Sequence, residues 1–292
     1  AHCPNLFECF ARSTATFMIG GDLCTRTCGY CAVKKGAPLP LDPGEPRRVA
    51  EAAARMRLRH VVVTMVNRDD LADGAAGHVV ETIEAIRGLL PGAAVEVLVS
   101  DFMGGFAAVE RVVRARPDVF NHNMETVRRL FKRIRPGGSY ERSLRVLGMA
   151  REIGPGMTTK SGIMVGMGEA EEDVLSLMDD LRRPGVDCQV MTIGQYLAPQ
   201  AKAVPMREYI HPDVYDRYRA AGQARGFAHV FAGPFVRSSY NAEEALRAAQ
   251  GGPRDQRRGD PEARSFLTPD GSGRNVPAPQ PRRIPLTIAR RG

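Results

Sequence analysis

The chain lacks long apolar runs and has few cysteines, and both features narrow its class. No stretch of about 18 consecutive apolar residues occurs and no signal peptide is visible, so we expect no transmembrane helix. Five of the six cysteines lie within the first 31 residues. In a secreted protein such a cluster would suggest disulfides. In a 292-residue chain with an α/β pattern it favours metal ligation in a reducing compartment.

Lysine is absent from the C-terminal stretch 247–292, which holds ten Arg against four Asp plus Glu and so carries +6. Because the whole chain carries +8, the body before this stretch carries about +2, which gives no argument for nucleic-acid binding. Its Pro, Gly and Arg content predicts a disordered tail, with a partner-binding arm as the alternative. We expect the chain beyond about Ala249 to be dispensable for chemistry.

Between residue 14 and about residue 232, apolar β-branched runs alternate with helical patterns. The predicted strands cover 14–20, 60–66, 95–99, 119–120, 159–165, 190–193 and 229–232. The predicted helices cover 46–57, 78–90, 106–115, 140–152, 169–182 and 212–224. Such alternation implies right-handed βαβ units and a parallel sheet, and 43% hydrophobic residues suffice for one large core.

We therefore predict an α/β fold with three parts. Residues 1–13 form an N-terminal, cysteine-bearing extension, residues 14–246 form a partial (β/α)6-type parallel barrel, and residues 247–292 form the disordered tail. Polar residues follow several predicted strands, and barrel enzymes place their active sites at the carboxyl ends of strands. We expect the active site there.

Three cysteines follow the first predicted strand at the spacing Cys-x3-Cys-x2-Cys, namely Cys24, Cys28 and Cys31. A loop can wrap these thiolates around one centre, and three thiolates bind soft metals and iron–sulfur clusters well. A structural zinc ion or an ordinary four-iron cluster would take a fourth protein ligand. The triplet therefore favours a cluster with one open iron, with a zinc knuckle or incidental thiols as the alternative.

The other cysteines are less informative by themselves. Cys3 and Cys9 are separated by five residues, a longer spacer than in a zinc knuckle. Cys188 is expected to be a small buried strand residue.

Several motifs taken together resemble those of the lipoyl synthases, a family of radical S-adenosylmethionine (SAM) enzymes. They include Cys3-Pro-Asn-Leu-Phe-Glu-Cys9 and Cys24-Thr-Arg-Thr-Cys28-Gly-Tyr-Cys31. Further matches lie at 67–71, 118–126, 135–137, 140–144, 160–162, 192–197 and 237–240. The resemblance runs from Ala1 to about Glu244, and the combination is more specific than any single motif.

The resemblance implies a SAM-binding four-iron, four-sulfur cluster on Cys24, Cys28 and Cys31, whose open iron SAM chelates. The expected SAM contacts are Asn123 and Glu125 for the ribose and, for the carboxylate, Lys160 with Ser161, or Arg142. A helix cap is the alternative role for Asn123 and Glu125. Asp69 and Asp70 would meet the SAM ammonium or order their loop through Arg68, and His122 is expected to be a hydrogen-bonded strand-end histidine.

The resemblance also implies a second, auxiliary four-iron, four-sulfur cluster, held by Cys3, Cys9 and Ser239, with Ser238 as the alternative serine. The family motif has one further cysteine, which would precede Ala1, so we expect an upstream segment to be missing from this sequence. A serine oxygen is a harder ligand than a thiolate, so its iron would be easier to release. We expect Ser239 to lie near both N-terminal cysteines.

The activity implied by the resemblance is insertion of two sulfur atoms at carbons 6 and 8 of an octanoyl chain on a lysine of a lipoyl carrier protein. SAM cleavage would supply a 5′-deoxyadenosyl radical, and the auxiliary cluster would supply the sulfur. The implied partners are octanoylated lipoyl carrier domains (2-oxoacid dehydrogenase E2 and glycine cleavage H protein), an electron donor such as ferredoxin or flavodoxin, and a cluster-repairing iron–sulfur carrier. No nucleic acid or membrane is expected. We expect a bacterial cytoplasm, with a mitochondrial matrix or a plastid as the alternative.

Two other functions are alternatives. The first is a different radical SAM sulfur-inserting enzyme, similar to biotin synthase, against which the N-terminal motif and Arg237-Ser-Ser-Tyr240 argue. The second is a non-catalytic iron–sulfur protein that binds lipoyl carriers. The missing auxiliary cysteine and Met65, where the family has a small residue, favour this second alternative.

Overall fold

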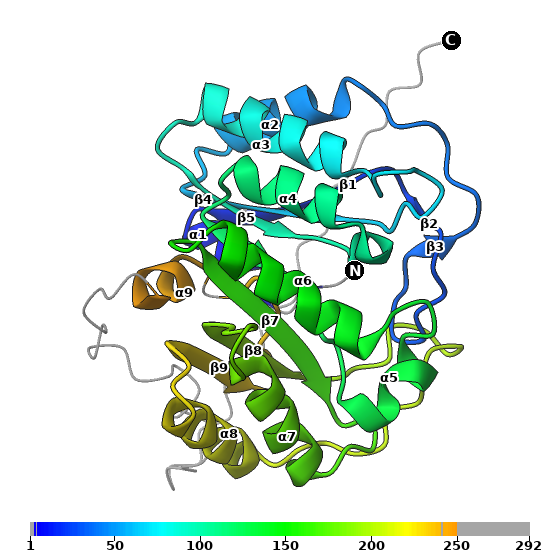
Figure 1. Cartoon of the computed structure of the whole chain (residues 1–292), viewed down its shortest axis with the longest axis vertical. Helices are drawn as coiled ribbons and strands as arrows, with labels where there is room; N and C mark the ends of the chain where they lie inside the picture. The colour runs from blue at the N-terminus through cyan, green and yellow to red at the C-terminus, as the bar shows by residue number, and fades with distance from the viewer. Residues whose placement is uncertain (1–2, 4, 241, 250–292) are drawn as a thin grey trace, which may run out of the picture. The chain divides into compact units, whose positions relative to one another are not determined.

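The computed structural model describes residue 3, residues 5–240 and residues 242–249. Its main sheet has seven parallel strands, in the order β1-β4-β5-β6-β7-β8-β9 (Figure 1). The strands are β1 (Thr14–Ile19), β4 (His60–Met65), β5 (Ala94–Leu98), β6 (Val119–Asn121), β7 (Thr158–Val165), β8 (Val190–Gln195) and β9 (His229–Gly233). The predicted parallel α/β sheet is confirmed, and each of the seven predicted strands is present in it, with β9 at the edge beside β8.

Helices connect successive strands and cover one side of the curved sheet (Figure 1). They are α2 (Glu45–Arg55), α3 (Ala76–Leu89), α4 (Phe106–Arg114), α6 (Tyr140–Ile153), α7 (Glu171–Arg182) and α8 (Pro212–Ala224). Pro46 lies in the first turn of α2, where its missing N–H has no helical partner to lose. The helices pack in chain order, α2 on α3 and α3 on α4, as right-handed crossovers require.

The two edges of the sheet, β1 and β9, leave the barrel wall partial, and the N-terminal segment spans this side. Helix α1 (Leu6–Ala11) packs beside β1, and α9 (Ala242–Ala249) packs beside β9. Two hydrogen bonds join these regions: Asn5 Nδ2 donates to the Phe235 carbonyl at 2.7 Å, and the Tyr240 hydroxyl lies 3.4 Å from Glu8 Oε1. Residues more than 200 positions apart thus close one side of the fold.

Six short elements were not predicted from the sequence. They are α1, α9, β2 (Leu23–Cys24), β3 (Lys34–Lys35), the 3-10 turn η1 (Phe102–Gly104) and α5 (Arg128–Ile134). Apolar periodicity identifies an element only over a longer window, and five of these span seven residues or fewer. Two of them, β2 and α5, position the candidate site.

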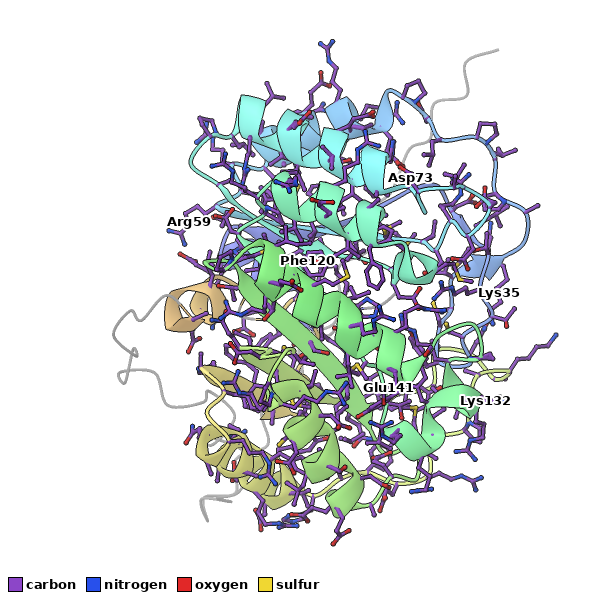
Figure 2. All side chains as sticks on the ribbon, viewed as in Figure 1. Lys35, Arg59, Asp73, Phe120, Lys132 and Glu141 are labelled. Carbon is purple, nitrogen blue, oxygen red and sulfur yellow. The ribbon has the colours of Figure 1, made fainter. Side chains whose placement is uncertain are left out.

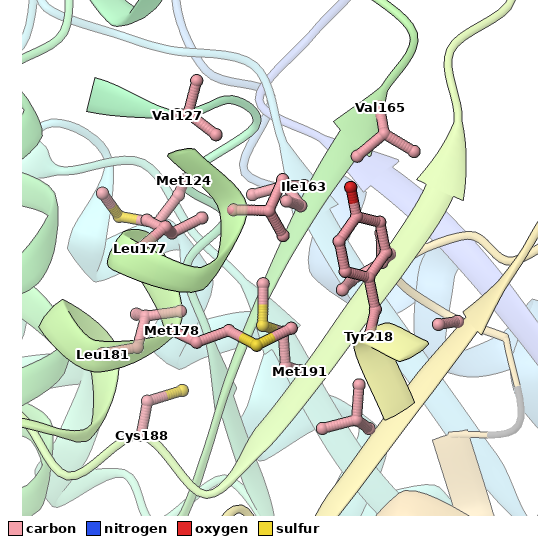
Figure 3. Close-up of a cluster of buried hydrophobic side chains, with 14 of the residues drawn as sticks. Met124, Val127, Ile163, Val165, Leu177, Met178, Leu181, Cys188, Met191 and Tyr218 are labelled. Atoms are coloured by element: carbon pink, nitrogen blue, oxygen red, sulfur yellow. The ribbon is translucent and has the colours of Figure 1, made fainter. Parts of the chain in front are cut away.

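Buried side chains fill two main clusters, one around β1, β4 and β5 and the other around β7 and β8. Figure 3 shows the second cluster, in which Met124, Met178 and Met191 surround Ile163. Cys188 lies at the edge of this cluster with no exposed surface, so its predicted burial is confirmed, but it precedes β8 by two residues and is not in a strand. Its burial raises the pKa of the thiol to about 12, so it stays protonated and inert.

The predicted disordered tail 247–292 lies almost wholly outside the residues that the structure describes; only 247–249, the last residues of α9, fall within them. Among the described helices, none has the length and apolar content needed to cross a membrane.

Candidate functional site

The cysteine triplet lies just beyond the carboxyl end of β1. Strands β2 and β3 pair in parallel, and the Gly36 N–H donates to the Cys24 carbonyl at 3.1 Å, so the two ends of the cysteine loop are held together. A third connection runs to the neighbouring strand, because the Thr25 N–H donates to the Asn67 carbonyl beyond β4 at 3.1 Å. The loop therefore sits at the edge where parallel-sheet enzymes place their chemistry.

The sulfur of Cys24 is surrounded by N–H donors. The backbone N–H groups of Arg26 and Asn67 donate to it at 3.5 Å and 3.4 Å, and the Asn67 side-chain amide lies 3.9 Å away. Cys31 accepts a similar bond from the Val33 N–H at 3.4 Å. Hydrogen bonds to sulfur stabilise thiolate charge and tune the potential of iron–sulfur clusters.

Cys28 and Cys31 interact electrostatically with each other, and Cys31 also interacts with Cys24. Burial raises the pKa of both the Cys28 and the Cys31 thiols, and the charge of each neighbouring thiolate adds to the effect, Cys31 acting on Cys28 and Cys24 acting on Cys31. The three sulfurs are thus near enough to interact.

Gly29, in the middle of the loop, is fixed between two distant segments. Its N–H donates to the Ile134 carbonyl at 2.9 Å, and its carbonyl accepts from the Val204 N–H at 2.8 Å. A Cβ at this position would lie 2.6 Å from a Val204 methyl group, which is a steric clash. Only glycine therefore allows the cysteine loop to sit between α5 and the segment around residue 204.

A buried charge network ties the loop to two strand ends. The Arg26 guanidinium binds Asp69, with Nε 2.7 Å from Oδ2, and Asp101, with Nη2 2.6 Å from Oδ1. Arg142 of α6 binds the other oxygen of Asp101 at 2.8 Å. Burial alone would raise the pKa of Asp101, but these two guanidinium groups hold it well below its ordinary value. Asp101 is therefore ionised and locks three elements together.

The strand-end residues Asn123 and Glu125 lie next to each other, with Asn123 Nδ2 donating to Glu125 Oε1 at 3.1 Å. Burial raises the pKa of Glu125, while nearby Arg135 and hydrogen bonds from Asn123 and Tyr30 partly oppose the rise. Asn123 Oδ1 is buried and has no partner among the described residues. An unpartnered amide oxygen beside a carboxylate provides acceptors for a ligand's hydroxyl groups. Their predicted contact with the SAM ribose stays a prediction.

The other expected SAM contacts already have partners. The ammonium of Lys160 is fully buried and binds Glu96 Oε1 at 3.1 Å, and Ser161 accepts from the Met124 N–H at 3.2 Å. Arg142 is engaged by Asp101 but keeps partial exposure. The Lys160–Glu96 pair weighs against a SAM role for Lys160, and the roles of all three residues stay predictions.

The expectation for His122 is confirmed, and the expectation that Asp69 and Asp70 order their loop through Arg68 is confirmed for Asp70 alone, since Asp69 binds Arg26. His122 is fully buried and hydrogen-bonded at both ring nitrogens, to the Val99 carbonyl at 2.8 Å and to Ser143 Oγ at 3.0 Å. Burial, with Arg135 nearby, lowers its pKa to about 3, so it stays neutral. Asp70 binds Arg68 at 2.8 Å and so orders its own loop.

The N-terminal cysteines and the Arg237-Ser-Ser-Tyr240 segment belong to one region. Cys3 is exposed and Cys9 is half-buried, and burial raises the pKa of the Cys9 thiol, with the nearby Cys3 adding to the rise. The Arg237 guanidinium is near enough to Cys3 for their charges to interact. With the Asn5–Phe235 and Glu8–Tyr240 hydrogen bonds, contacts flank Ser239 on both sides. Ligation by Ser239 stays a prediction.

The cysteine loop fits a cluster better than a single ion. Within residues 3, 5–240 and 242–249, no three His, Cys, Asp or Glu side chains are gathered closely enough to hold one metal ion. In an iron–sulfur cluster each thiolate binds a separate iron, so the sulfurs need not meet at one point. N–H donors on the sulfurs and the buried loop suit such a cluster, and full convergence of the three sulfurs stays a prediction.

Three functional groups had no assigned role in the sequence analysis: Arg26, Asn67 and Asp101. Arg26 lies between Cys24 and Cys28, where a charged side chain needs a partner if the loop is buried. Asn67 and Asp101 directly follow strands, which is the signal that could have drawn attention to them. The pairing of Arg26 with Asp101 spans 75 positions, and no local pattern encodes it.

Comparison with known proteins gives the family. A model of the radical SAM superfamily matches residues 18–181. The chain is 57% identical to the lipoyl synthase of Caldanaerobacter subterraneus subsp. tengcongensis, over 86% of this chain and 87% of that protein. This chain belongs to the lipoyl synthase family. The lipoyl synthase of Rubrobacter xylanophilus is 53% identical, over 86% of this chain and 78% of that protein.

Solved structures show the same fold at low identity. Streptococcus suis SuiB bound to S-adenosylmethionine matches 78% of this chain and 53% of its own, with a TM-score of 0.60 and 11% identity. Methylornithine synthase matches 72% of this chain and 62% of its own, with a TM-score of 0.56 and 14% identity. These likenesses support the radical SAM fold of this lipoyl synthase family member, and the fold alone.

Proposed function

We propose that this chain is a lipoyl synthase that inserts two sulfur atoms, at carbons 6 and 8, into an octanoyl chain carried on a lysine of a lipoyl carrier protein. The observation that carries the proposal is 57% identity to a lipoyl synthase across most of both chains. The cysteine loop at the carboxyl end of β1 supports it, because that edge is where a barrel enzyme binds its substrates.

Two four-iron, four-sulfur clusters and SAM are the proposed cofactors. Cys24, Cys28 and Cys31 would hold the SAM-binding cluster, and Cys3, Cys9 and Ser239 would hold the auxiliary cluster. When bound, the first supplies the electron that cleaves SAM and the second supplies sulfur. The N–H donors on Cys24 and the hydrogen bonds across Asn5 and Glu8 support the two assignments.

The chain's own residues position these groups. Arg26 holds the cysteine loop against the ends of β4 and β5 through Asp69 and Asp101. Asn123 and Glu125 offer acceptors beside the loop, and Glu125 shares a hydrogen bond with Tyr30, the residue before Cys31. Gly29 keeps the loop pressed against Ile134 and Val204, which limits water on that side.

The proposed partners are octanoylated domains of 2-oxoacid dehydrogenase E2 and the glycine cleavage H protein, together with a one-electron donor and an iron–sulfur repair carrier. The names of the relatives support an action on lipoyl carriers. Their bacterial sources support a place in the bacterial cytoplasm.

Reconstitution of the full-length protein tests the proposal. Iron and sulfide are counted per chain, and an octanoylated carrier peptide is then followed by mass spectrometry in the presence of SAM and dithionite. We expect about eight iron atoms per chain, as two four-iron clusters require. The product should be heavier by two sulfur atoms as the dithiol, and by two sulfur atoms less two hydrogens after oxidation to the disulfide. SAM cleavage with unmodified peptide would favour a different radical SAM enzyme, and no SAM cleavage would favour a non-catalytic carrier-binding protein.

A further inference from the structure

Exposed basic side chains surround the outer side of the cysteine loop. They come from three segments: 32–36, which contains β3; 130–136, mostly in α5; and 200–207. These segments contain seven Lys and Arg and no Asp or Glu. We call the six exposed ones the basic rim: Lys34, Lys35, Lys132, Arg133, Lys202 and Arg207. Because the body of the chain carries only about +2, this concentration of charge is local.

The three segments meet at the cysteine loop itself. Gly29 binds Ile134 of α5 on one side and Val204 on the other, at 2.9 Å and 2.8 Å. Lys35 reaches back to the same loop, with Nζ 3.3 Å from the Cys28 carbonyl. Figure 2 shows Lys35 and Lys132 on the same side of the protein. The three segments that carry the basic rim therefore meet at Gly29, which lies between Cys28 and Cys31.

The charges of the basic rim are not paired with carboxylates, unlike those of the first two residues of α5. Arg128 and Arg129 bind Asp180 and Asp173 at 3.0 Å and 2.8 Å. Among the described residues, no carboxylate lies within ion-pair distance of Lys35, Lys132 or Lys202, or of the two arginines of the rim. Lys34 has only a loose contact with Asp22, at 3.9 Å. Unpaired, exposed like charges create a positive field that attracts an acidic surface.

We infer that the basic rim is the docking surface for an acidic one-electron donor protein. The inference rests on the proposed function, which needs one electron delivered to the cysteine loop for each SAM. Within the triplet, Cys31 is the least buried cysteine, and the rim surrounds this exposed side. With a flavodoxin as donor, the flavin hydroquinone loses one electron and becomes the semiquinone, and the oxidised iron–sulfur site of this chain gains that electron.

An octanoylated carrier fits this surface less well. Such a carrier must deliver an apolar chain, and four large exposed apolar side chains gather at a different place. They lie beside the N-terminal cysteines, at Leu6, Phe7, Phe10 and Phe235. The basic rim carries six exposed cations, with the single exposed apolar side chains Leu39 and Tyr209 close to it in the sequence. A mainly charged surface suits a weak, fast electron-transfer encounter.

The test compares Lys132→Glu/Lys202→Glu with Arg57→Glu/Arg116→Glu. Each variant replaces two exposed basic residues by Glu, so both change the net charge equally. The control residues precede β4 and β6, at the opposite end of the strands from the cysteine loop. Binding of oxidised flavodoxin is measured by calorimetry on each protein without added SAM. We expect the rim variant to lose about tenfold in affinity at low salt while the control matches the native chain, and the difference to vanish at about 1 M salt.

The rate of cluster reduction distinguishes a docking site for the electron donor from a docking site for the carrier protein. With reduced flavodoxin, the rim variant should reduce its iron–sulfur site about tenfold more slowly, and with dithionite at the native rate. Equal affinities for flavodoxin in the rim and control variants would overturn the inference. The inference would also be overturned if the rim variant kept its flavodoxin affinity but showed dithionite-driven turnover that was impaired only at low carrier concentration. That result would make the rim a carrier site. A native chain that fails to cleave SAM with dithionite would refute the proposed function, and the affinity comparison would still decide the inference.

Discussion

The guanidinium of Arg26 and the carboxylate of Asp101 form a buried ion pair, with 2.6 Å between Nη2 and Oδ1. Their side chains are 2% and 0% exposed. One residue belongs to the cysteine loop and the other follows β5, so the pair fixes the loop relative to the sheet. Burying these charges is costly, and the cost is offset only while both partners are present.

Neutralising one partner should therefore destabilise the protein. We predict that Asp101→Asn lowers the free energy of unfolding by about 3 kcal/mol, because Arg26 keeps its buried charge and loses a partner. Urea unfolding of the cluster-free chain measures this loss. Asp213→Asn, in an exposed pair with His211, is the control and should change stability by less than about 0.5 kcal/mol. Equal effects of the two variants would show that the Arg26–Asp101 pair does not anchor the loop.

The cysteine triplet gives the second prediction, with a matched cysteine elsewhere in the chain. Cys24→Ala should lose iron and sulfide after reconstitution, and with them SAM cleavage. Cys188→Ala removes a buried thiol that binds only backbone carbonyls, at 3.5 Å and 3.7 Å, so its iron content should match the native chain. Iron and sulfide analysis is the measurement. A Cys24→Ala protein with full iron content and normal SAM cleavage would remove Cys24 from the ligands.

Much of the fold could be predicted because the strands are apolar and the helices amphipathic. The run at 60–66 became β4 and the run at 159–165 became β7, each within a residue of its predicted start. A parallel sheet buries both faces of its strands, so its strands read as continuous apolar runs. His122 could be assigned a hydrogen-bonded role for a similar reason, since a buried imidazole at a strand end needs partners.

The contacts that build the site could not be predicted, because they join distant segments. Gly29 is fixed by Val204, and Arg26 by Asp101, and nothing near either residue in the sequence specifies the partner. Lys160 shows the same limit. A lysine in a strand near the active-site edge fits a SAM contact, but the sheet register places it where its ammonium reaches Glu96 of β5.

The Lys160–Glu96 pair gives a pH prediction. Burial alone would raise the pKa of Glu96, but the Lys160 ammonium, the His60 ring 3.5 Å away and a hydrogen bond from Asn121 outweigh burial and lower it to about 2. A carboxylate whose pKa is depressed in the folded state stabilises that state above its unfolded pKa of about 4.3, and the stability is lost as pH falls towards 2. Relative to Glu96→Gln, the native chain should lose about 3 kcal/mol of unfolding free energy over this range.

A double substitution gives the control for this prediction. Glu96→Gln leaves a buried ammonium without a charge partner, whereas Glu96→Gln/Lys160→Met removes both charges and should recover most of the lost stability. Urea unfolding between pH 2 and pH 7 compares the three proteins. A stability difference between the native chain and Glu96→Gln that stays constant across this range would contradict the depressed pKa. SAM affinity of the double variant near the native value would also exclude the predicted SAM contact of Lys160.

The last prediction concerns Ser239, with its neighbour Ser238 as the matched control. Both serines are half-buried and lie in the same turn between Arg237 and Tyr240, and hydrogen bonds at Asn5 and Glu8 hold this region against the N-terminal segment. If Ser239 binds an iron of the auxiliary cluster, its oxygen must leave that iron when the cluster gives up sulfur, and a serine oxygen suits a ligand that has to leave. Ser239→Ala should then keep SAM cleavage and the first hydrogen abstraction while the yield of lipoyl product falls at least tenfold.

The matched control, Ser238→Ala, should keep SAM cleavage, hydrogen abstraction and the native product yield. Deuterium transfer from an octanoyl chain labelled at carbon 6 reports the first step, and mass spectrometry of the carrier peptide reports the product. If Ser239→Ala gives the native yield of lipoyl product, the serine only hydrogen-bonds the turn, as serine commonly does in such positions. If Ser238→Ala alone loses product, the ligand is the neighbouring serine.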